Sequence, residues 1–314
     1  MKLLKSKKLL PNDVIGIICP ASVPKDLTKI EKSVKYFEKL GYRVEVGKNV
    51  GKQTGYLAGN DGERAEDLHD MFKNKDIKAI FCARGGYGSA RLLSKMNFEL
   101  IKKNPKIFVG YSDITALNLA IFKKTGLVTF AGPMAVSDFA DEASEFTEDN
   151  FWRVITNSKI IGKVYNPNNE KFYSLNNKGK VEGKLFAANL TILCSLLGTD
   201  FLPNLKDTIL LIEDINEPPY KIDRMFNQLR LAKITDNLKG LLFGRFVDCY
   251  EIDKVKSTLS LNEVIADYFN GIKIPVMYNI KHGHVRDNIT FPIGLKTKIN
   301  ASRSIIQILE NAVI

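Results

Sequence analysis

The chain has 314 residues, of which 45% are hydrophobic and 26% charged, the composition of a soluble globular protein with one large domain or two ordinary ones. No apolar run approaches the ~18 residues of a membrane span, and the basic segment 1–13 lacks the apolar stretch of a secretory signal, so we expect a cytoplasmic protein without membrane association. The net charge of +11 comes from scattered lysines without a basic block or an aromatic–basic repeat, which argues against a nucleic-acid partner.

The four cysteines, Cys19, Cys82, Cys194 and Cys249, are far apart in the sequence. None forms a C-x-x-C pair or a metal-ligand spacing, and three of them lie in apolar runs, so we expect buried, reduced thiols. The sequence offers no cluster of residues that would bind a metal, and we expect neither a metal nor another cofactor.

Strands and helices alternate along the first half of the chain. Short apolar or alternating runs predict strands at 14–19, 42–46, 77–83, 107–109 and 127–130, whereas helical spacing predicts helices at 26–40, 63–72 and 112–124. Such alternation predicts a parallel sheet with helices on both faces. Ligands of these sheets gather at the carboxyl ends of the strands, so the turns at that edge form the candidate site.

The composition changes between residues 157 and 180, where the chain becomes polar and rich in Asn and Lys. We interpret 157–180 as a linker or exposed excursion between an N-terminal α/β domain, 1–156, and a C-terminal domain, 181–314. The predicted elements of the second part are helices at 189–197, 220–231 and 261–269, strands at 208–212, 240–246 and 275–280, a loop at 281–288 and short strands within 289–308.

A glycine-rich turn, 84–89, follows the strand at 77–83. Glycines between a strand and a helix let the backbone approach a ligand and point N–H groups at it. The spacing G-G-x-G does not match the dinucleotide fingerprint G-x-G-x-x-G, and no acidic partner stands at the right distance. A tight structural turn remains the alternative interpretation.

A second turn, Gly110-Tyr111-Ser112-Asp113, connects a short buried strand to a helix. A serine at such a corner has the geometry of a nucleophile elbow, although Ile114 stands where G-x-S-x-G has its second glycine. An ordinary helix cap made by Ser112 and Asp113 is the alternative.

Two residues of the second part extend this pattern into a triad. Glu213 stands at the end of the predicted strand, directly after residues 208–212, and His284 lies in the loop 281–288. Serine, then acid, then histidine is the chain order of α/β-hydrolase triads, in which histidine takes the hydroxyl proton and the carboxylate orients the imidazole. His282 competes with His284 for the role of the base, and each residue taken alone has an ordinary structural interpretation.

Long segments of the chain resemble the LD-carboxypeptidase family, serine peptidases that also include the microcin C immunity hydrolases. The resemblance runs from about residue 14 to residue 294 and is carried by ARGGYGSARLL, NPKIFVGYSDITAL, KTGLVTFAGPM, KGKVEGKLFAANLTILCSLLGT, LLIEDINEPPYKIDRMFNQLRLA and GHVRDNITFPIG. It implies a catalytic triad of Ser112, Glu213 and His284, rather than His282. It also implies an oxyanion hole formed by the backbone amides of Asp113 and Gly86.

The same resemblance implies a fold and a substrate. The fold is a flavodoxin-like or amidotransferase-like parallel-sheet domain joined to a smaller β-rich C-terminal domain, often as a homodimer, with the active site between the two. The reaction is hydrolysis of the amide between an L-centre (L-lysine or meso-diaminopimelate) and the terminal D-alanine of murein tetrapeptides. It is performed through an acyl-enzyme during cell-wall recycling in the cytoplasm.

Candidates for substrate binding come partly from charge and partly from the resemblance. Arg84, Lys281 and Arg286 lie in or beside the predicted active loops and are candidates for binding the terminal carboxylate, although each is equally a surface charge. Asn189 resembles a family position near the substrate. Glu217 is a candidate for the side-chain amine of the substrate, and a carboxylate at a helix N-terminus is its ordinary interpretation.

Two other functions remain open. The microcin C immunity branch cleaves peptidyl or aminoacyl nucleotide amides, but the segment IEDINEPPYKIDR resembles the murein enzymes instead. A non-catalytic ligand-binding homologue would keep the fold without the chemistry, and the presence of all three triad residue types argues against it.

Overall fold

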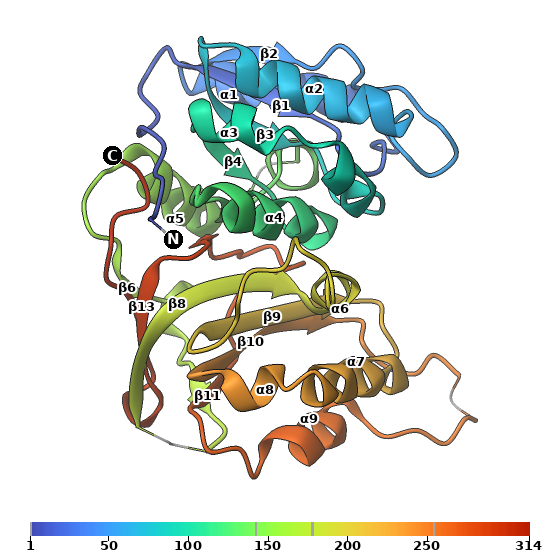
Figure 1. Cartoon of the computed structure of the whole chain (residues 1–314), viewed down its shortest axis with the longest axis vertical. Helices are drawn as coiled ribbons and strands as arrows, with labels where there is room; N and C mark the ends of the chain where they lie inside the picture. The colour runs from blue at the N-terminus through green and yellow to red at the C-terminus, as the bar shows by residue number, and fades with distance from the viewer. Residues whose placement is uncertain (1, 142, 177–178, 254) are drawn as a thin grey trace.

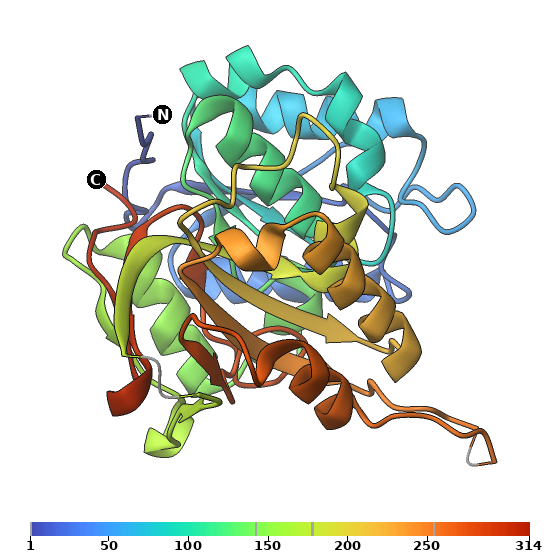
Figure 2. The same ribbon diagram turned by 60° about the horizontal axis from the view of Figure 1, so that its bottom comes forward.

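Two β-sheets organise the protein, and each carries its own helices (Figure 1 and Figure 2). The computed structural model describes residues 2–141, 143–176, 179–253 and 255–314. The first half of the chain, blue to green in Figure 1, forms the upper unit, and most of the second half forms the lower one. The expected mixed α/β fold with a parallel N-terminal sheet is confirmed.

The first sheet has six strands in the order β12-β5-β4-β3-β1-β2. Strands β1 to β5 run parallel, and β12 pairs antiparallel with β5 at one edge. Strands β1 and β4 are fully buried, as expected of a parallel sheet covered on both faces. The strands are β1 (Val14–Ile18), β2 (Arg43–Val46), β3 (Ile77–Cys82), β4 (Ile107–Val109), β5 (Phe130–Ala131) and β12 (Phe291–Pro292).

Helix α2 begins at a signal that the sequence carries. At the start of α2, the Asn60 side chain accepts from the Glu63 N–H while the Glu63 carboxylate accepts from the Asn60 N–H. The helices are α1 (Thr28–Lys39), α2 (Asp61–Lys73), α3 (Phe98–Lys103), α4 (Thr115–Thr125) and α5 (Glu145–Thr156), and the short helical turns are η1 (Ser89–Lys95), η2 (Ser112–Ile114) and η3 (Ala135–Phe139).

Helix α4 joins the two units. Its side chains are buried on nearly every face, as in a helix that is enclosed by protein. One side of α4 faces the first sheet. On its other side, the Phe122 ring meets the Phe186 ring of β8 edge-on, with centroids 5.2 Å apart. Figure 1 shows α4 directly above β8. The turn η2, which precedes α4 and begins with Ser112, therefore lies between the two sheets.

The second sheet has eight strands in the order β6-β14-β13-β8-β9-β10-β11-β7. Strands β8 to β11 run parallel, and the outer strands pair antiparallel. The strands are β6 (Gly162–Val164), β7 (Tyr173–Ser174), β8 (Lys180–Asn189), β9 (Ile209–Ile215), β10 (Gly240–Val247), β11 (Val276–Tyr278), β13 (Lys296–Asn300) and β14 (Ile305–Ile308). The helices are α6 (Leu190–Ser195), α7 (Pro219–Leu231), α8 (Ile234–Asn237) and α9 (Leu261–Phe269), with the turns η4 (Pro167–Asn169) and η5 (Ala301–Arg303).

The segment predicted as a linker, 157–180, differs from that expectation. Strands β6 and β7 lie within it and form the two outer edges of the second sheet. Edge strands of two or three residues with polar side chains give no hydrophobic pattern, so the sequence did not reveal them. Because β12 returns to the first sheet, the chain also crosses between the units more than once.

Candidate active site

Ser112 occupies the corner between β4 and α4 in a strained backbone conformation. Its φ of 61° lies in the left-handed region that non-glycine residues avoid, and such strain is typical of functional sites. Gly110 makes the corner possible, because a Cβ there would lie 2.8 Å from Ile114 Cγ2. The short turn η2 then leads directly into α4. The corner expected from the sequence is present, with isoleucine in place of the second glycine.

His284 connects this serine to a buried carboxylate. Its Nε2 lies 3.0 Å from Ser112 Oγ, and its Nδ1 lies 2.8 Å from Glu213 Oε2. The preceding Gly283 has a φ of 110°, and a Cβ on it would lie 2.5 Å from Glu213 Oε2. Only glycine therefore lets the loop pack against the carboxylate and present the imidazole to the serine.

Glu213 lies inside β9 rather than at the end of the strand as predicted, because β9 continues to Ile215. Its neighbour in the sheet is Asn189 of β8. The side chain is 1% exposed, and its Oε1 has no hydrogen-bond partner among the residues described here. A strand backbone fixes this carboxylate beneath the imidazole, with Oε2 as the atom that His284 meets.

The pKa of His284 is raised above that of an ordinary histidine. Burial lowers this pKa, but the hydrogen bond and the negative charge of Glu213 outweigh burial, and the charge of Asp214 adds to them. The site therefore stabilises the imidazolium that forms when histidine accepts a proton.

Tyr111 packs against the imidazole and is bonded in turn to Asp138, and sequence reasoning missed both. The Tyr111 ring meets the His284 ring edge-on, with centroids 5.1 Å apart, and its hydroxyl donates to Asp138 Oδ1 over 3.4 Å. Asp138 Oδ2 accepts the Met134 N–H over 2.8 Å. Burial raises the pKa of Asp138 to about 6. Tyr111 lies inside the turn motif, but no pattern in the sequence connects Asp138 to it.

The glycine turn lies against the serine. A Cβ on Gly85 would be 3.0 Å from Ser112 Oγ and 3.3 Å from the Asp113 nitrogen, so this glycine backs directly onto the reactive corner. Within the described ranges, the N–H groups of Gly86 and Asp113 have no hydrogen-bond acceptor. Both amides predicted for the oxyanion hole thus lack a partner among the described residues.

Two buried groups hold the turn in place. Ser89 donates its N–H to Asp113 Oδ2 over 2.8 Å and its hydroxyl to the Asp113 carbonyl over 2.5 Å. The fully buried Arg64 donates to the carbonyls of Gly88 and Pro20 over 2.9 and 2.6 Å. These bonds connect the glycine turn to the serine corner and to the end of β1.

His282, the competing histidine, has a structural environment. It is 1% exposed, its ring meets the Phe291 ring edge-on, and its Nδ1 lies 2.7 Å from the Ile289 carbonyl, to which it donates. Burial lowers its pKa to about 4, so it stays neutral near pH 7. His284, and not His282, is the histidine beside Ser112.

The three predicted substrate-binding residues differ in how far their side chains are already engaged. Asn189 caps α6 and donates to Asp214 Oδ1 over 2.9 Å, so both ends of its amide have partners. Glu217 Oε2 lies 3.0 Å from Lys221 Nζ. Arg84 is half-buried beside the glycine turn and donates to the Val23 carbonyl over 3.4 Å, without an ion pair in the described chain.

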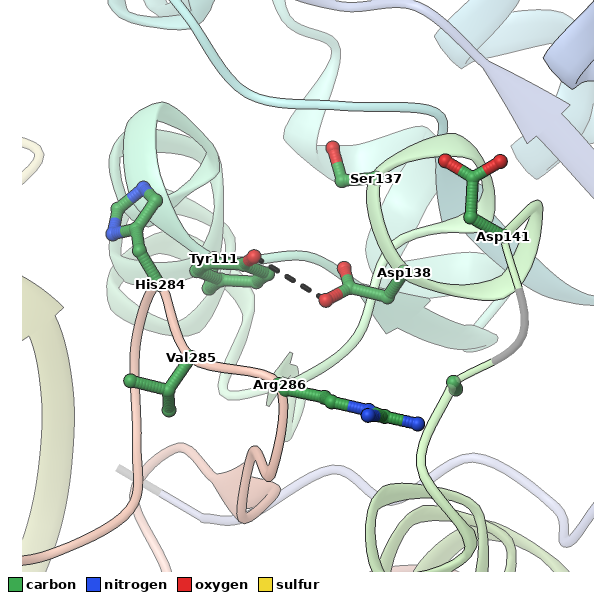
Figure 3. A pocket seen from close by; sticks show the side chains of 8 residues that line it. Tyr111, Ser137, Asp138, Asp141, His284, Val285 and Arg286 are labelled. Atoms are coloured by element: carbon green, nitrogen blue, oxygen red, sulfur yellow. Dashed lines mark hydrogen bonds between the residues drawn. The ribbon is translucent and has the colours of Figure 1, made fainter.

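A cavity of about 410 Å³ opens beside His284 (Figure 3). Tyr111 and His284 line one side, Arg286 and Asp141 line the other, and Asp138 lies between them. Lys281, the other basic residue of the loop, is paired instead with Glu170 over 3.2 Å. The remaining lining residues are Ser137, Ala143 and Val285.

Nothing in the described part of the chain resembles a metal centre, since no three His, Cys, Asp or Glu side chains gather as ligands would. All four cysteines are free and buried, and burial raises the pKa of Cys19 and Cys194 to about 12. Among the helices described, none has the length and apolar character to cross a membrane.

Comparisons with known proteins agree with this geometry. The models of the LD-carboxypeptidase N-terminal and C-terminal domains match residues 15–132 and 182–299. A probable murein peptide carboxypeptidase of Bacillus subtilis is 41% identical over 95% of this chain and 92% of its own. Two solved structures are similar: the microcin C7 self-immunity protein MccF (TM-score 0.90, 28% identity, 99% of this chain and all of the other) and a muramoyltetrapeptide carboxypeptidase of Oxalobacter formigenes (0.82, 30%, 96% and all of the other). The chain belongs to the LD-carboxypeptidase family.

Proposed function

We propose that this protein is a serine-type LD-carboxypeptidase of the muramoyltetrapeptide carboxypeptidase type. Its substrates are murein tetrapeptides, and it hydrolyses the amide between the L-centre of L-lysine or meso-diaminopimelate and the terminal D-alanine. The single observation that carries this proposal is the continuous chain of contacts from Ser112 Oγ through His284 to Glu213. The murein peptides named for the relatives support the choice of substrate.

Each residue of the chain has a chemical role in the proposed reaction. Ser112 attacks the carbonyl carbon while His284 Nε2 takes its proton, and Glu213 holds the imidazolium through Nδ1. The tetrahedral intermediate then collapses as His284 protonates the leaving nitrogen. Water, activated by the same histidine, hydrolyses the acyl-enzyme and restores the free serine.

The amides of Asp113 and Gly86 are the proposed oxyanion donors. Their N–H groups lack acceptors in the described chain, and the glycine turn backs onto the corner that carries Ser112. In comparable sites each donor contributes on the order of 3 kcal/mol to transition-state stabilisation. The side chain of Asp113 serves a different purpose, because its carboxylate is occupied by Ser89.

Arg84 and Glu217 stay proposals for substrate binding, and Asn189 is supported least because its amide is engaged within the fold. Arg84 is supported by its place beside Gly86 and its lack of an ion pair in the described ranges. Alanine substitutions that raise KM at constant kcat would support a role in binding.

A microcin-immunity activity is the second candidate, because the likeness to MccF has the higher TM-score of the two solved structures. The two activities differ in the substrate's leaving group, so purified protein is tested with a murein tetrapeptide and with an aminoacyl sulfamoyl adenosine. We expect D-alanine release from the first, detected by mass spectrometry, and little turnover of the second.

The Ser112→Ala protein is the control for this assay. It should lose turnover by about 10⁶-fold while keeping its circular dichroism and melting temperature. Release of D-alanine by the Ser112→Ala protein would contradict the assignment of the nucleophile. Absence of D-alanine release by the wild-type protein would contradict the proposed function and leave a non-catalytic binding protein as the alternative.

We also propose a cytoplasmic homodimer. Four free, buried thiols suit a reducing compartment. The homodimer is expected from the family resemblance alone, and sedimentation equilibrium of the purified protein tests it.

A further inference from the structure

The cavity of Figure 3 borders the part of the site where the leaving group must lie. In the proposed reaction, His284 delivers its proton to the nitrogen that leaves, so this nitrogen comes within hydrogen-bond reach of Nε2. The part of the substrate beyond the scissile bond therefore extends past the imidazole. His284 itself lines the cavity, which places this open space next to the departing residue.

Arg286 supplies the cavity with a positive charge that is free to pair. Its side chain is exposed, and its guanidinium has no ion pair or hydrogen bond to any residue that the structure describes. Two other charges nearby are already paired, Lys281 with Glu170 and Asp141 with Lys29. A guanidinium matches a carboxylate in a bidentate geometry, which makes Arg286 a fitting partner for an anion.

We infer that this cavity is the subsite for the leaving D-amino acid and that Arg286 binds its terminal carboxylate. The inference rests on the proposed function and adds the group that recognises a free chain end. Asp138 suits the amino group of the leaving D-amino acid, and Arg286 suits its carboxylate. Figure 3 shows Arg286 extending away from His284, with Asp138 above it in this view.

The leaving step follows from this arrangement. Collapse of the tetrahedral intermediate breaks the C–N bond, and the proton from His284 turns the amide nitrogen into a free amine, which then takes a second proton from water. The resulting ammonium lies near Asp138, while the carboxylate of the same D-alanine remains on Arg286. Both charges of the product thus have counter-charges within one cavity.

The test compares a tetrapeptide that ends in D-alanine with the same peptide ending in D-alaninamide. The wild-type protein should prefer the free acid in kcat/KM by about ten- to a hundredfold. Arg286→Ala should lose this factor on the free acid and keep wild-type activity on the amide, while Arg286→Lys restores part of the loss. Arg153→Ala is the matched control, because Arg153 is an exposed arginine of α5 outside the cavity and should change neither value.

Three outcomes would overturn the inference. The first is equal cleavage of both peptides by the wild-type protein, and the second is a preference for the acid that persists in Arg286→Ala. The third is that Asp138→Asn abolishes a preference for lysine over norleucine as the third residue while Arg286→Ala has no effect. This result would assign the cavity to the substrate's side-chain ammonium.

A failure of the proposed function is distinguished by binding. If the wild-type protein releases no D-alanine, calorimetry on Ser112→Ala with both peptides still measures the preference for the free carboxylate. A preference that disappears in Ser112→Ala/Arg286→Ala would support the subsite without the reaction. Equal binding of acid and amide by Ser112→Ala would overturn the subsite, whereas the release of D-alanine decides the function separately.

Discussion

Ser112 Oγ and His284 Nε2 lie 3.0 Å apart, although the serine belongs to the unit of the first sheet and the histidine to a loop that follows the second. The carboxylate that orients the histidine lies in β9 of the second sheet. The nucleophile and its base therefore come from different units. Any shift of one sheet against the other changes the distance between Ser112 Oγ and His284 Nε2. The buried contacts of α4 with β8 oppose such a shift.

The strained backbone at Ser112 gives a first prediction. A residue with a Cβ costs about 1 kcal/mol or more at a φ of 61°, and glycine relieves this cost. Ser112→Gly should therefore be more stable than Ser112→Ala by up to about 1 kcal/mol, while both are inactive. Urea denaturation measures the difference. A Ser112→Gly protein that is less stable than Ser112→Ala would show that the corner is not strained.

Gly85 gives a second prediction. An alanine Cβ would lie 3.0 Å from Ser112 Oγ and 3.3 Å from the Asp113 nitrogen, in the space that a bound carbonyl needs. Gly85→Ala should reduce kcat/KM by about 10²- to 10³-fold, the range observed for loss of an oxyanion donor. Circular dichroism should stay unchanged, because no left-handed conformation at Gly85 requires glycine.

Gly271→Ala is the matched control for Gly85→Ala. A Cβ on Gly271 meets no atom of the described structure within 4 Å, so this variant should keep full activity. Wild-type turnover by the Gly85→Ala protein would mean that the carbonyl of the substrate does not approach the corner from the side of the glycine turn.

The pH profile of Glu213→Gln gives a third prediction. The reaction needs neutral His284, so kcat/KM falls as pH drops through its pKa, which lies above the ordinary ~6.5. Removing the charge of Glu213 leaves burial to act on the imidazole, so this acid limb should move to lower pH. The rate itself should fall about 10⁴-fold, because the amide no longer stabilises the imidazolium.

The control for this profile is Glu182→Gln, which removes an exposed carboxylate of β8 that pairs with Lys296 over 3.0 Å. It should leave both the rate and the acid limb unchanged. An acid limb that stays at the same pH in Glu213→Gln would contradict the electrostatic role assigned to Glu213.

The sequence revealed the parts of the site that are marked by local geometry. Gly110 and Ser112 mark the corner, because each position has a steric or conformational requirement. The choice of His284 over His282 came from the family resemblance, and the structure supplies its reason in the burial of His282 and its bond to the Ile289 carbonyl.

Other parts of the site depend on packing that no local pattern encodes. Asp138 reaches Tyr111 from the turn η3. Arg286 shares a cavity with Asp138 only because the two units are packed together. Strands β6 and β7 are too short to produce a hydrophobic period, and their pairing with distant strands creates both edges of the second sheet.

The buried His282 gives a fourth prediction, which concerns stability rather than rate. Its pKa in the folded protein is about 4, against about 6.5 when unfolded, because burial disfavours the imidazolium. Between these values the unfolded chain binds a proton that the folded protein does not, so stability is lost as pH falls from about 6.5 to 4. His282→Asn keeps a donor for the Ile289 carbonyl and removes the titration, so its free energy of unfolding should fall less over this range, by up to about 3 kcal/mol.

Urea denaturation at pH 7 and pH 4 measures this difference. The control is His69→Asn, at a half-buried position of α2, which should show a smaller change. An identical loss of stability in wild-type and His282→Asn proteins would mean that His282 is protonated in the folded state well above pH 4.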